Sequence, residues 1–318
     1  MTTIAPEIAL SGMRWTAESL EQRENWKFTA PPALAADARA LSQWAAAVGD
    51  PVVSLARGTL DLPSVRGLAA QIAWELDHGM GVAWVRGVPS LDEQVLRLLY
   101  LALGLQLGTP IETYGRLYDV ADSGASYKNK PIPVSQTRES TGMHTDSSGK
   151  NVCPRVIGLL CIRPALRGGN SCIVSAAETH ERLRAASPAL LERLYRTYVR
   201  DVVTPGADRS PEAVAQNRFP VFAWQGRLVL RYMRYWIERG HERAGVPLGP
   251  EDKAAFDTLD RELSDKRNVL TFRMEPRDML FIDNTTSAHD RDAYEDDPAA
   301  PRLMVRLWLD RPLPLGGA

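Results

Sequence analysis

The sequence has few cysteines, no long apolar run and almost no net charge. Its three cysteines, Cys153, Cys161 and Cys172, form no CxxC pair, so neither a disulfide framework nor a cysteine zinc site is expected. The longest apolar run, residues 98–105, is too short to span a bilayer. A net charge of -1 lacks the basic excess typical of proteins that bind nucleic acid. A soluble cytosolic protein with reduced thiols is favoured.

Signals of targeting and of modular organisation are also missing. The first twenty residues lack a basic segment followed by an apolar core, so we expect no signal peptide. No internal repeat, low-complexity tract or Gly/Ser linker marks a boundary within the chain. We therefore expect residues 1–318 to form a single domain. We also expect the protein to work in the cytoplasm without a membrane partner, either alone or as a homo-oligomer.

Apolar patterns divide the chain into a helical first third and a strand-rich remainder. One apolar stripe through Leu68 and Leu76 and another across residues 91–105 have helical spacing. Between them, residues 81–86 form a short apolar run that predicts a buried strand. The N-terminal helical portion is expected to cover about residues 1–110.

Short apolar runs beyond residue 140 predict at least seven strands, as an antiparallel barrel or jelly roll requires. These predicted strands cover residues 156–162, 171–174, 220–224, 227–233, 269–273, 279–282 and 302–309.

Predicted helices interrupt this series of strands. Ser187-Pro188 is typical of a helix start, and the apolar face that follows runs from Leu190 to Tyr198. Residues 250–263 predict another helix. We thus predict an α+β fold with a mainly β core. It is a double-stranded β-helix (jelly roll) over about residues 111–313, with N-terminal helices and a helical insertion over about residues 177–265.

His144 and Asp146 are the strongest chemical signal. They lie two residues apart, so both side chains project from the same face of an extended segment. His289 lies far downstream, where a barrel can bring it beside this pair. Two imidazoles and one carboxylate are the protein ligands of a facial-triad iron(II) site, which leaves positions open for a cosubstrate and O2. A His-x-Asp tripeptide also arises by chance, and Asp290 and Asp292 near His289 are expected to form turns or to contact the ligands.

Two arginines follow the second histidine. Arg302 and Arg306 lie four residues apart on a predicted strand, so they point to one face. An inward arginine is costly unless an anion meets it, and its planar fork suits the carboxylate of a keto-acid cosubstrate. A solvated pair on an outward face is the alternative.

Taken together, these segments and their order resemble the taurine dioxygenase-like (TauD/TfdA) family of Fe(II)/2-oxoglutarate-dependent oxygenases. The matching segments are residues 81–87, Met143-His-Thr-Asp146, Gly168-Gly-Asn-Ser171, Phe281-Ile-Asp-Asn284, His289 and residues 302–308. The resemblance implies that His144, Asp146 and His289 hold iron(II). It also implies that the far carboxylate of 2-oxoglutarate meets Arg302 and the hydroxyl of Ser171.

The same resemblance implies a reaction. It is the oxidative decarboxylation of 2-oxoglutarate to succinate and CO2, coupled to hydroxylation of an unactivated C–H bond. The retained Asp146 favours hydroxylation over halogenation, while desaturation, epoxidation and cyclisation stay open. Arg306 is expected to grip the anionic group of a small substrate such as an amino acid or derivative, either free or carrier-bound. Apart from the resemblance, residue types suggest that Arg231 lines the substrate pocket and that residues 114–134 form a mobile lid. The alternative is that these segments contribute only packing aromatics and solvated arginines.

Three alternatives remain at this point. A non-catalytic β-barrel could bind a metal or a small acid without turnover. A zinc hydrolase could use the same three ligands, but it does not explain Arg302. A dinucleotide-binding fold is disfavoured because Trp84 occupies the place of the third glycine of the fingerprint.

Overall fold

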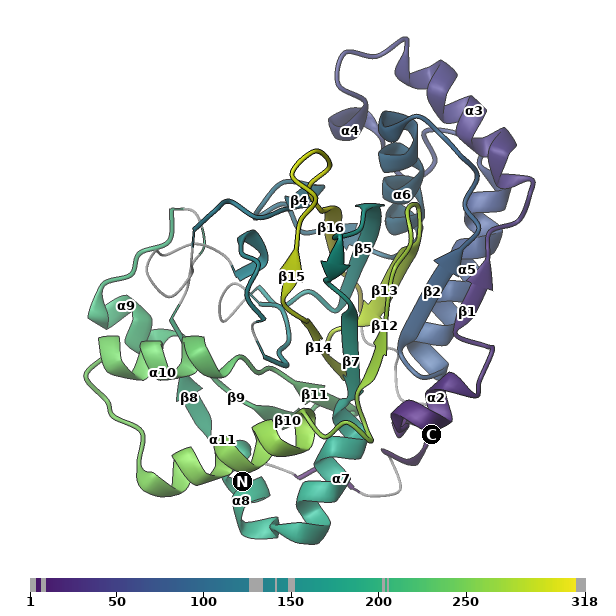
Figure 1. The fold of residues 1–318 in the computed structure, drawn as a ribbon. Coiled ribbons are helices and arrows are strands. Elements are labelled where there is room, and N and C mark those ends of the chain that lie inside the picture. The colour runs from purple at the N-terminus through teal and green to yellow at the C-terminus, as the bar shows by residue number, and fades with distance from the viewer. Residues whose placement is uncertain are drawn as a thin grey trace.

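A seven-stranded sheet and a three-stranded sheet form the centre of the molecule (Figure 1). The computed structural model describes residues 4–6, 10–125, 134–140, 142–147, 152–201, 204 and 206–312. The larger sheet has the order β1-β2-β13-β5-β16-β3, with β4 also paired to β16. Its strands are β1 (Lys27–Thr29), β2 (Val82–Arg86), β3 (Thr109–Pro110), β4 (Tyr118–Val120), β5 (Val156–Arg163), β13 (Met279–Asp283) and β16 (Leu303–Asp310).

The smaller sheet has the order β12-β7-β14 and is antiparallel throughout. Its strands are β12 (Leu270–Phe272), β7 (Ser171–Ser175) and β14 (Ser287–Arg291), and a short pair, β6 (Arg167–Gly168) and β15 (Tyr294–Glu295), lies apart from it. Side chains from both sheets line one cavity. The predicted jelly-roll fold with added helices is confirmed, although the two sheets do not close into a continuous barrel within the described residues.

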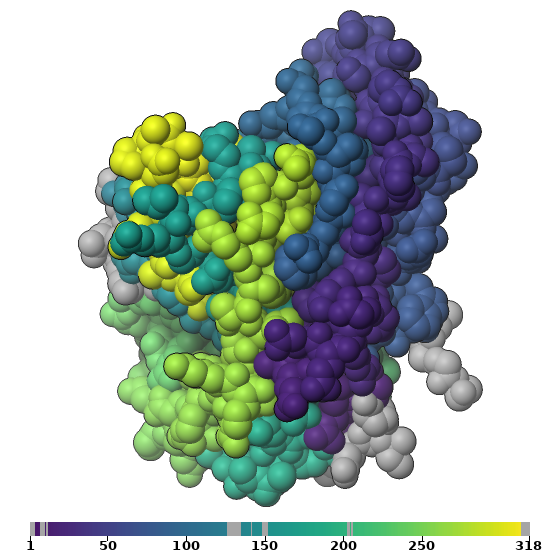
Figure 2. Space-filling view, turned by 45° about the vertical axis from the view of Figure 1, so that its right-hand side comes forward, coloured from purple at the N-terminus to yellow at the C-terminus, as the bar shows by residue number. Residues whose placement is uncertain are grey.

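Helices from the N-terminal third cover the outer face of the larger sheet, as predicted (Figures 1 and 2). They are α3 (Leu34–Ala45), α4 (Pro51–Ser54), α5 (Pro63–His78) and α6 (Glu93–Leu107). Helix α2 (Ala17–Glu21) contacts β12 instead, and the short 3-10 helices are η1 (Ser11–Met13) and η2 (Val134–Gln136). Among the described residues, no helix combines the length and the apolar character needed to cross a membrane.

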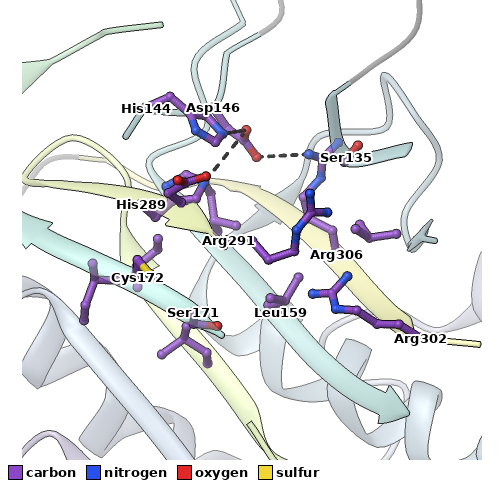
Figure 3. Close-up of a pocket in the computed structure, with 16 residues that line it drawn as sticks. Ser135, His144, Asp146, Leu159, Ser171, Cys172, His289, Arg291, Arg302 and Arg306 are labelled. Carbon is purple, nitrogen blue, oxygen red and sulfur yellow. Dashed lines mark hydrogen bonds and ion pairs between the residues drawn. The ribbon is translucent and has the colours of Figure 1, made fainter. Parts of the chain in front are cut away.

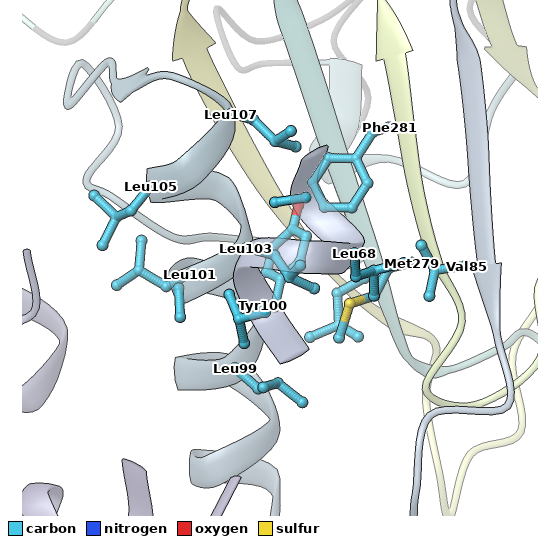
Figure 4. Packing of buried hydrophobic residues seen from close by; sticks show 14 of the residues in the cluster. Leu68, Val85, Leu99, Tyr100, Leu101, Leu103, Leu105, Leu107, Met279 and Phe281 are labelled. Carbon is cyan, nitrogen blue, oxygen red and sulfur yellow. The ribbon is translucent and has the colours of Figure 1, made fainter. Parts of the chain in front are cut away.

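The strand period of two separates the two faces of the larger sheet. Met279 and Phe281 of β13 pack against the helices, whereas Leu280 and Ile282 point into the space between the sheets. Figure 4 shows Phe281 beside Tyr100 of α6, with ring centroids 5.8 Å apart. Tyr100 also lies against Gly158 of β5, where a Cβ would be only 2.4 Å from the Tyr100 hydroxyl. The helical layer therefore fixes the position of the strands that carry the site.

The insertion after β7 contains helices and two antiparallel strand pairs, one of which lies where strands over residues 220–224 and 227–233 were predicted. Its helices are α7 (Ala176–Ala186), α8 (Pro188–Leu194), α9 (Pro211–Gln216), α10 (Arg234–Arg243) and α11 (Pro250–Leu263). Two antiparallel pairs lie among them: β8 (Thr197–Val199) with β9 (Arg218–Pro220), and β10 (Phe222–Trp224) with β11 (Leu228–Leu230). The predicted helix at Ser187-Pro188 ends at Leu194, and Tyr198 lies on β8, where it pairs with Phe219 instead.

The hairpin of β10 and β11 is shorter than the strands predicted over residues 220–224 and 227–233. β11 ends at Leu230, and α10 already begins at Arg234. The cause is a long-range contact, because the Thr145 N–H donates to the Tyr232 carbonyl at 2.8 Å and the Tyr232 N–H donates to the Thr145 hydroxyl at 2.9 Å. Residues after β11 therefore bind the segment that carries His144 instead of extending the hairpin.

Candidate functional site

The three residues predicted to bind a metal lie together at one end of the cavity (Figure 3). Asp146 Oδ1 is 3.6 Å from His144 Nε2 and 3.9 Å from His289 Nε2. One donor atom from each residue lies within 4.8 Å of the others. His144 and His289 also exchange two backbone hydrogen bonds, of 3.0 and 2.9 Å. Two imidazoles and one carboxylate therefore converge on a single point, as a facial triad requires.

Asn284, a residue to which the sequence assigned no role, fixes the backbone of Asp146. Its Oδ1 accepts from the Asp146 N–H, and its Nδ2 donates to the Asp146 and Pro154 carbonyls, each at 2.8 Å. Asn284 is fully buried at the end of β13. A buried amide with every polar atom engaged has a strongly defined orientation. The long-range contact between Asn284 and Asp146 thus places the carboxylate.

The second carboxylate oxygen of Asp146 has its own partners. Trp308 Nε1 donates to Oδ2 at 2.8 Å and Arg306 Nη1 at 3.2 Å. Burial by itself raises the pKa of Asp146, but the charge of Arg306 and the hydrogen bond to His144 outweigh it and hold the pKa well below its usual range. The carboxylate is therefore ionised, with Oδ2 occupied and Oδ1 facing the histidines.

The imidazoles are arranged to present Nε2. His144 Nδ1 lies 2.9 Å from the Gly142 carbonyl, which favours the proton on Nδ1 and leaves Nε2 as a lone pair. Burial and the neighbouring His144 lower the pKa of His289 to about 4. His289 is thus neutral near pH 7, as a metal ligand must be.

Arg302 occupies another part of the same cavity, together with Ser171 (Figure 3). Its side chain is buried, and its Nη1 has no hydrogen-bond partner among the described residues. Burial, with the charge of Arg291, lowers the pKa of Arg302 to about 10, so the guanidinium stays charged near neutral pH. A buried cation with an unused donor is a ready partner for a carboxylate.

The remaining predicted residues have different surroundings. Arg306 lines the cavity, as Arg302 does, although a register shift between Leu303 and Met304 interrupts β16. The anion that Arg306 meets is Asp146, a partner that spacing along the strand did not indicate. Arg231 does not line this cavity; it lies on the insertion, with its guanidinium 3.7 Å from the Phe219 ring centroid. Of the predicted lid over 114–134, residues 126–133 lie outside the described residues.

The other histidines, and the aspartates near His289, have structural partners. The three histidines outside the triad contact neighbouring groups of the fold: His180 lies beside the Tyr195 hydroxyl, His241 beside Val199 and Val246, and His78 beside Trp74. Asp283, fully buried, pairs with Arg155 and Arg227 at 3.2 Å. Asp292 accepts from Asn170 and Asp290 from Ser140.

A two-sheet core with two histidines, one carboxylate and a buried arginine around one cavity is the arrangement of a non-haem iron oxygenase that uses a keto acid. The family model for the taurine catabolism dioxygenase TauD, TfdA family matches residues 39–308. The chain belongs to this family of Fe(II)/2-oxoglutarate-dependent oxygenases, and it is an oxidoreductase.

Relatives in sequence and in structure agree with this assignment. An FR-33289 synthase from Streptomyces rubellomurinus is 28% identical over 308 residues, which cover 93% of this chain and 88% of that protein. A uridine-5'-phosphate dioxygenase from a Streptomyces species is 32% identical over 186 residues, or 55% of this chain and 63% of that protein.

Solved structures share the fold at low identity. Asparagine oxygenase in complex with Fe(II), 3-hydroxyasparagine and succinate has a TM-score of 0.62 at 15% identity, covering 89% of this chain and 93% of that one. The non-heme iron oxygenase OrfP, in complex with Fe and alpha-ketoglutaric acid, has a TM-score of 0.62 at 18% identity and the same two coverages.

Proposed function

We propose that the protein hydroxylates an unactivated C–H bond of a small anionic substrate, such as an amino acid or a derivative of one. One observation carries this proposal. The three metal-ligand residues line the same cavity as Arg302, whose Nη1 donor has no hydrogen-bond partner among the described residues. The solved relatives that share the fold include complexes with hydroxylated asparagine and hydroxylated arginine. Desaturation, epoxidation and cyclisation would use the same ligands and differ in how the substrate is placed.

The residues present fit the iron and the cosubstrate. His144 Nε2, His289 Nε2 and Asp146 Oδ1 would hold iron(II), because they converge and Oδ2 of Asp146 is already engaged. Arg302 and the Ser171 hydroxyl would hold the far carboxylate of 2-oxoglutarate, because the Arg302 Nη1 donor is buried without a partner among the described residues. When bound, iron and 2-oxoglutarate supply the oxidising power, with O2 consumed and succinate and CO2 released.

The other side chains of the cavity position these groups and exclude water. Arg306 and Trp308 prevent the Asp146 carboxylate from rotating. Apolar side chains of both sheets, Ile157, Leu159 and Ile173 among them, line the space between the triad and Arg302. A site with these walls limits access of bulk water to the reacting centre. The predicted grip of Arg306 on the substrate stays part of this proposal, and Arg306 would have to share that role with its bond to Asp146.

We further propose that the protein works in the cytoplasm on a small molecule, without nucleic acid or membrane partners. The arrangement of residues 1–318 as one domain, and a homo-oligomeric state, stay predictions.

Anaerobic addition of iron(II) and 2-oxoglutarate tests the proposal. The wild-type protein should develop the visible charge-transfer band of the iron chelate, and His144→Ala should not. Arg302→Leu should retain iron binding but need about 100-fold more 2-oxoglutarate, because a charge-assisted bidentate contact is lost. Wild-type protein that binds iron but gives no band would overturn the proposal and favour a non-catalytic metal-binding protein.

Release of succinate identifies the substrate class. A screen of free amino acids and their derivatives should find compounds that raise succinate formation above the uncoupled rate. A substrate-dependent increase that is lost in Asp146→Ala supports substrate-coupled oxidation at the proposed site.

A further inference from the structure

The charged side chains that line the cavity do not balance one another. Three arginines and two aspartates line it, and they are Arg291, Arg302, Arg306, Asp146 and Asp290. The imidazoles add no charge, because they must be neutral to bind a metal. Iron(II) brings two positive charges and 2-oxoglutarate two negative charges, so these two groups cancel each other. The loaded cavity therefore keeps an excess of one positive charge among the described residues.

Arg291 is the arginine whose charge is left over. Its side chain donates only to uncharged groups, the backbone carbonyls of Thr137 at 2.8 Å, of Glu139, and of Asp292 at 3.3 Å. Burial lowers the pKa of Arg291, and the acidic groups around it do not offset this effect. Its charge also acts on the cavity, since it is the next cause after burial that lowers the pKa of Arg302.

Neither carboxylate of the cavity is placed to receive an ammonium group. One oxygen of Asp146 lies beside the two imidazoles, and the other already accepts two hydrogen bonds. Asp290 accepts from the Ser140 hydroxyl at 2.8 Å and lines a neighbouring groove as well. Residues 126–133 and 148–151, which flank the metal-binding segment in the sequence, contain lysines but no aspartate or glutamate.

A hydroxyl without a partner belongs to the same cavity. Ser135 lines the cavity, and its Oγ is buried without a hydrogen-bond partner among the described residues (Figure 3). The backbone after it is held in place, because the Gln136 carbonyl accepts from the Ser123 N–H at 2.9 Å and from its hydroxyl at 3.0 Å. The next carbonyl, of Thr137, accepts from Arg291. A hydroxyl both donates and accepts, so it suits an uncharged polar group such as an amide.

We propose that the substrate is a net anion without an ammonium group, such as an N-acylated amino acid, and that the Ser135 hydroxyl binds its uncharged polar group. The anionic group compensates the positive charge left over in the cavity. A zwitterion would bring no net charge and would bury an ammonium group without a carboxylate to meet it, which is costly. This inference rests on the proposed function, because it names the substrate class for that same site.

Three small probes test the charge preference without a known substrate. N-acetylglycine has one negative charge and an amide, acetate has the charge alone, and glycine is a zwitterion. Each is titrated into the protein loaded with manganese(II) and saturating 2-oxoglutarate. Relaxation of the probe protons by the metal gives the affinity, and the zinc(II) protein is the blank. We expect N-acetylglycine to bind at least about tenfold more tightly than glycine, with acetate between them. Glycine that binds as tightly as N-acetylglycine would overturn the inference.

Substitutions of Ser135 connect this preference to the cavity. Ser135→Ala should weaken N-acetylglycine binding by about threefold or more and leave acetate unchanged, because only the bond to the amide is lost. Ser135→Asp supplies a carboxylate, so glycine should then bind at least as tightly as N-acetylglycine. Ser135→Asn is the matched control, because it has nearly the same size without the charge, and it should keep the preference for N-acetylglycine.

These variants can also contradict the inference. The same preference for N-acetylglycine in Ser135→Asp and Ser135→Asn would refute the charge argument. If Ser135→Asp does not fold, Ser135→Ala provides the second test, and unchanged N-acetylglycine binding in that variant would overturn the role of Ser135.

The outcomes separate this inference from the proposed function. The iron(II) charge-transfer band together with tighter binding of N-acetylglycine supports both. The band together with equal binding of the three probes overturns the substrate class and leaves the oxygenase assignment standing. A preference for N-acetylglycine that Ser135→Asp reverses, in a protein whose wild type gives no band, supports the charge preference of the cavity and overturns the proposed function.

Discussion

The hydrogen bond from Trp308 Nε1 to Asp146 Oδ2 should control metal affinity more than stability. Trp308→Phe removes this 2.8 Å bond but keeps an aromatic ring against Tyr114, whose ring centroid lies 5.3 Å away. Hydrogen bonds to charged groups contribute about 1.5–3 kcal/mol. Groups that orient a metal ligand typically change metal affinity by about 10- to 100-fold. We therefore expect Trp308→Phe to weaken iron(II) binding by at least about tenfold in anaerobic calorimetry.

Trp84→Phe is the matched control for this experiment. Trp84 belongs to the same inner cluster, is 8% exposed against 6% for Trp308, and donates to the Asp278 carboxylate at 3.1 Å. Both variants should lose similar amounts of unfolding free energy in urea, but only Trp308→Phe should lose iron affinity. Equal iron affinities in the two variants, or an equal loss in both, would refute the assignment of Trp308 as a positioning residue.

Two further predictions follow from buried hydrogen bonds. Asn284→Ala leaves three buried backbone groups without their partner. At about 1–3 kcal/mol for each group, it should lower the free energy of unfolding by roughly 3–9 kcal/mol, and a urea midpoint close to wild type would contradict this. Burial lowers the pKa of His241, whose Nε2 accepts from the Val199 N–H at 3.0 Å. As pH falls below about 6.5, the unfolded chain takes up this proton first and stability is lost, so His241→Gln should show a weaker loss in urea titrations from pH 7.5 to 5.

Local patterns predicted the regular elements well where tertiary contacts did not compete with them. The helix predicted over residues 250–263 is α11, because its apolar positions, its N-terminal proline and its packing all agree. The strand Ser287–Arg291 had no such pattern, since its side chains are mostly polar. It forms because β7 pairs with all five of its residues, and its polar side chains line the cavity.

The sequence also contained the chemistry of the candidate site. His144, Asp146, His289 and Arg302 are recognisable by residue type and by order along the chain, because iron and a keto acid need those groups. Ligand identity is a local property of the side chain, and the spacing of two between His144 and Asp146 already puts them on one face.

Only the tertiary structure decided how each charged group is paired. Arg306 and Trp308 meet Asp146 across 160 and 162 residues, and Asn284 reaches it across 138. Arg200 on the insertion meets Ser147, the residue after Asp146, only in the folded chain. Such contacts depend on how strands from distant parts of the chain register against one another. The order of residue types along the sequence therefore indicated the metal and the cosubstrate, and the fold determined that Arg306 pairs with Asp146 while Arg302 keeps an unused donor among the described residues.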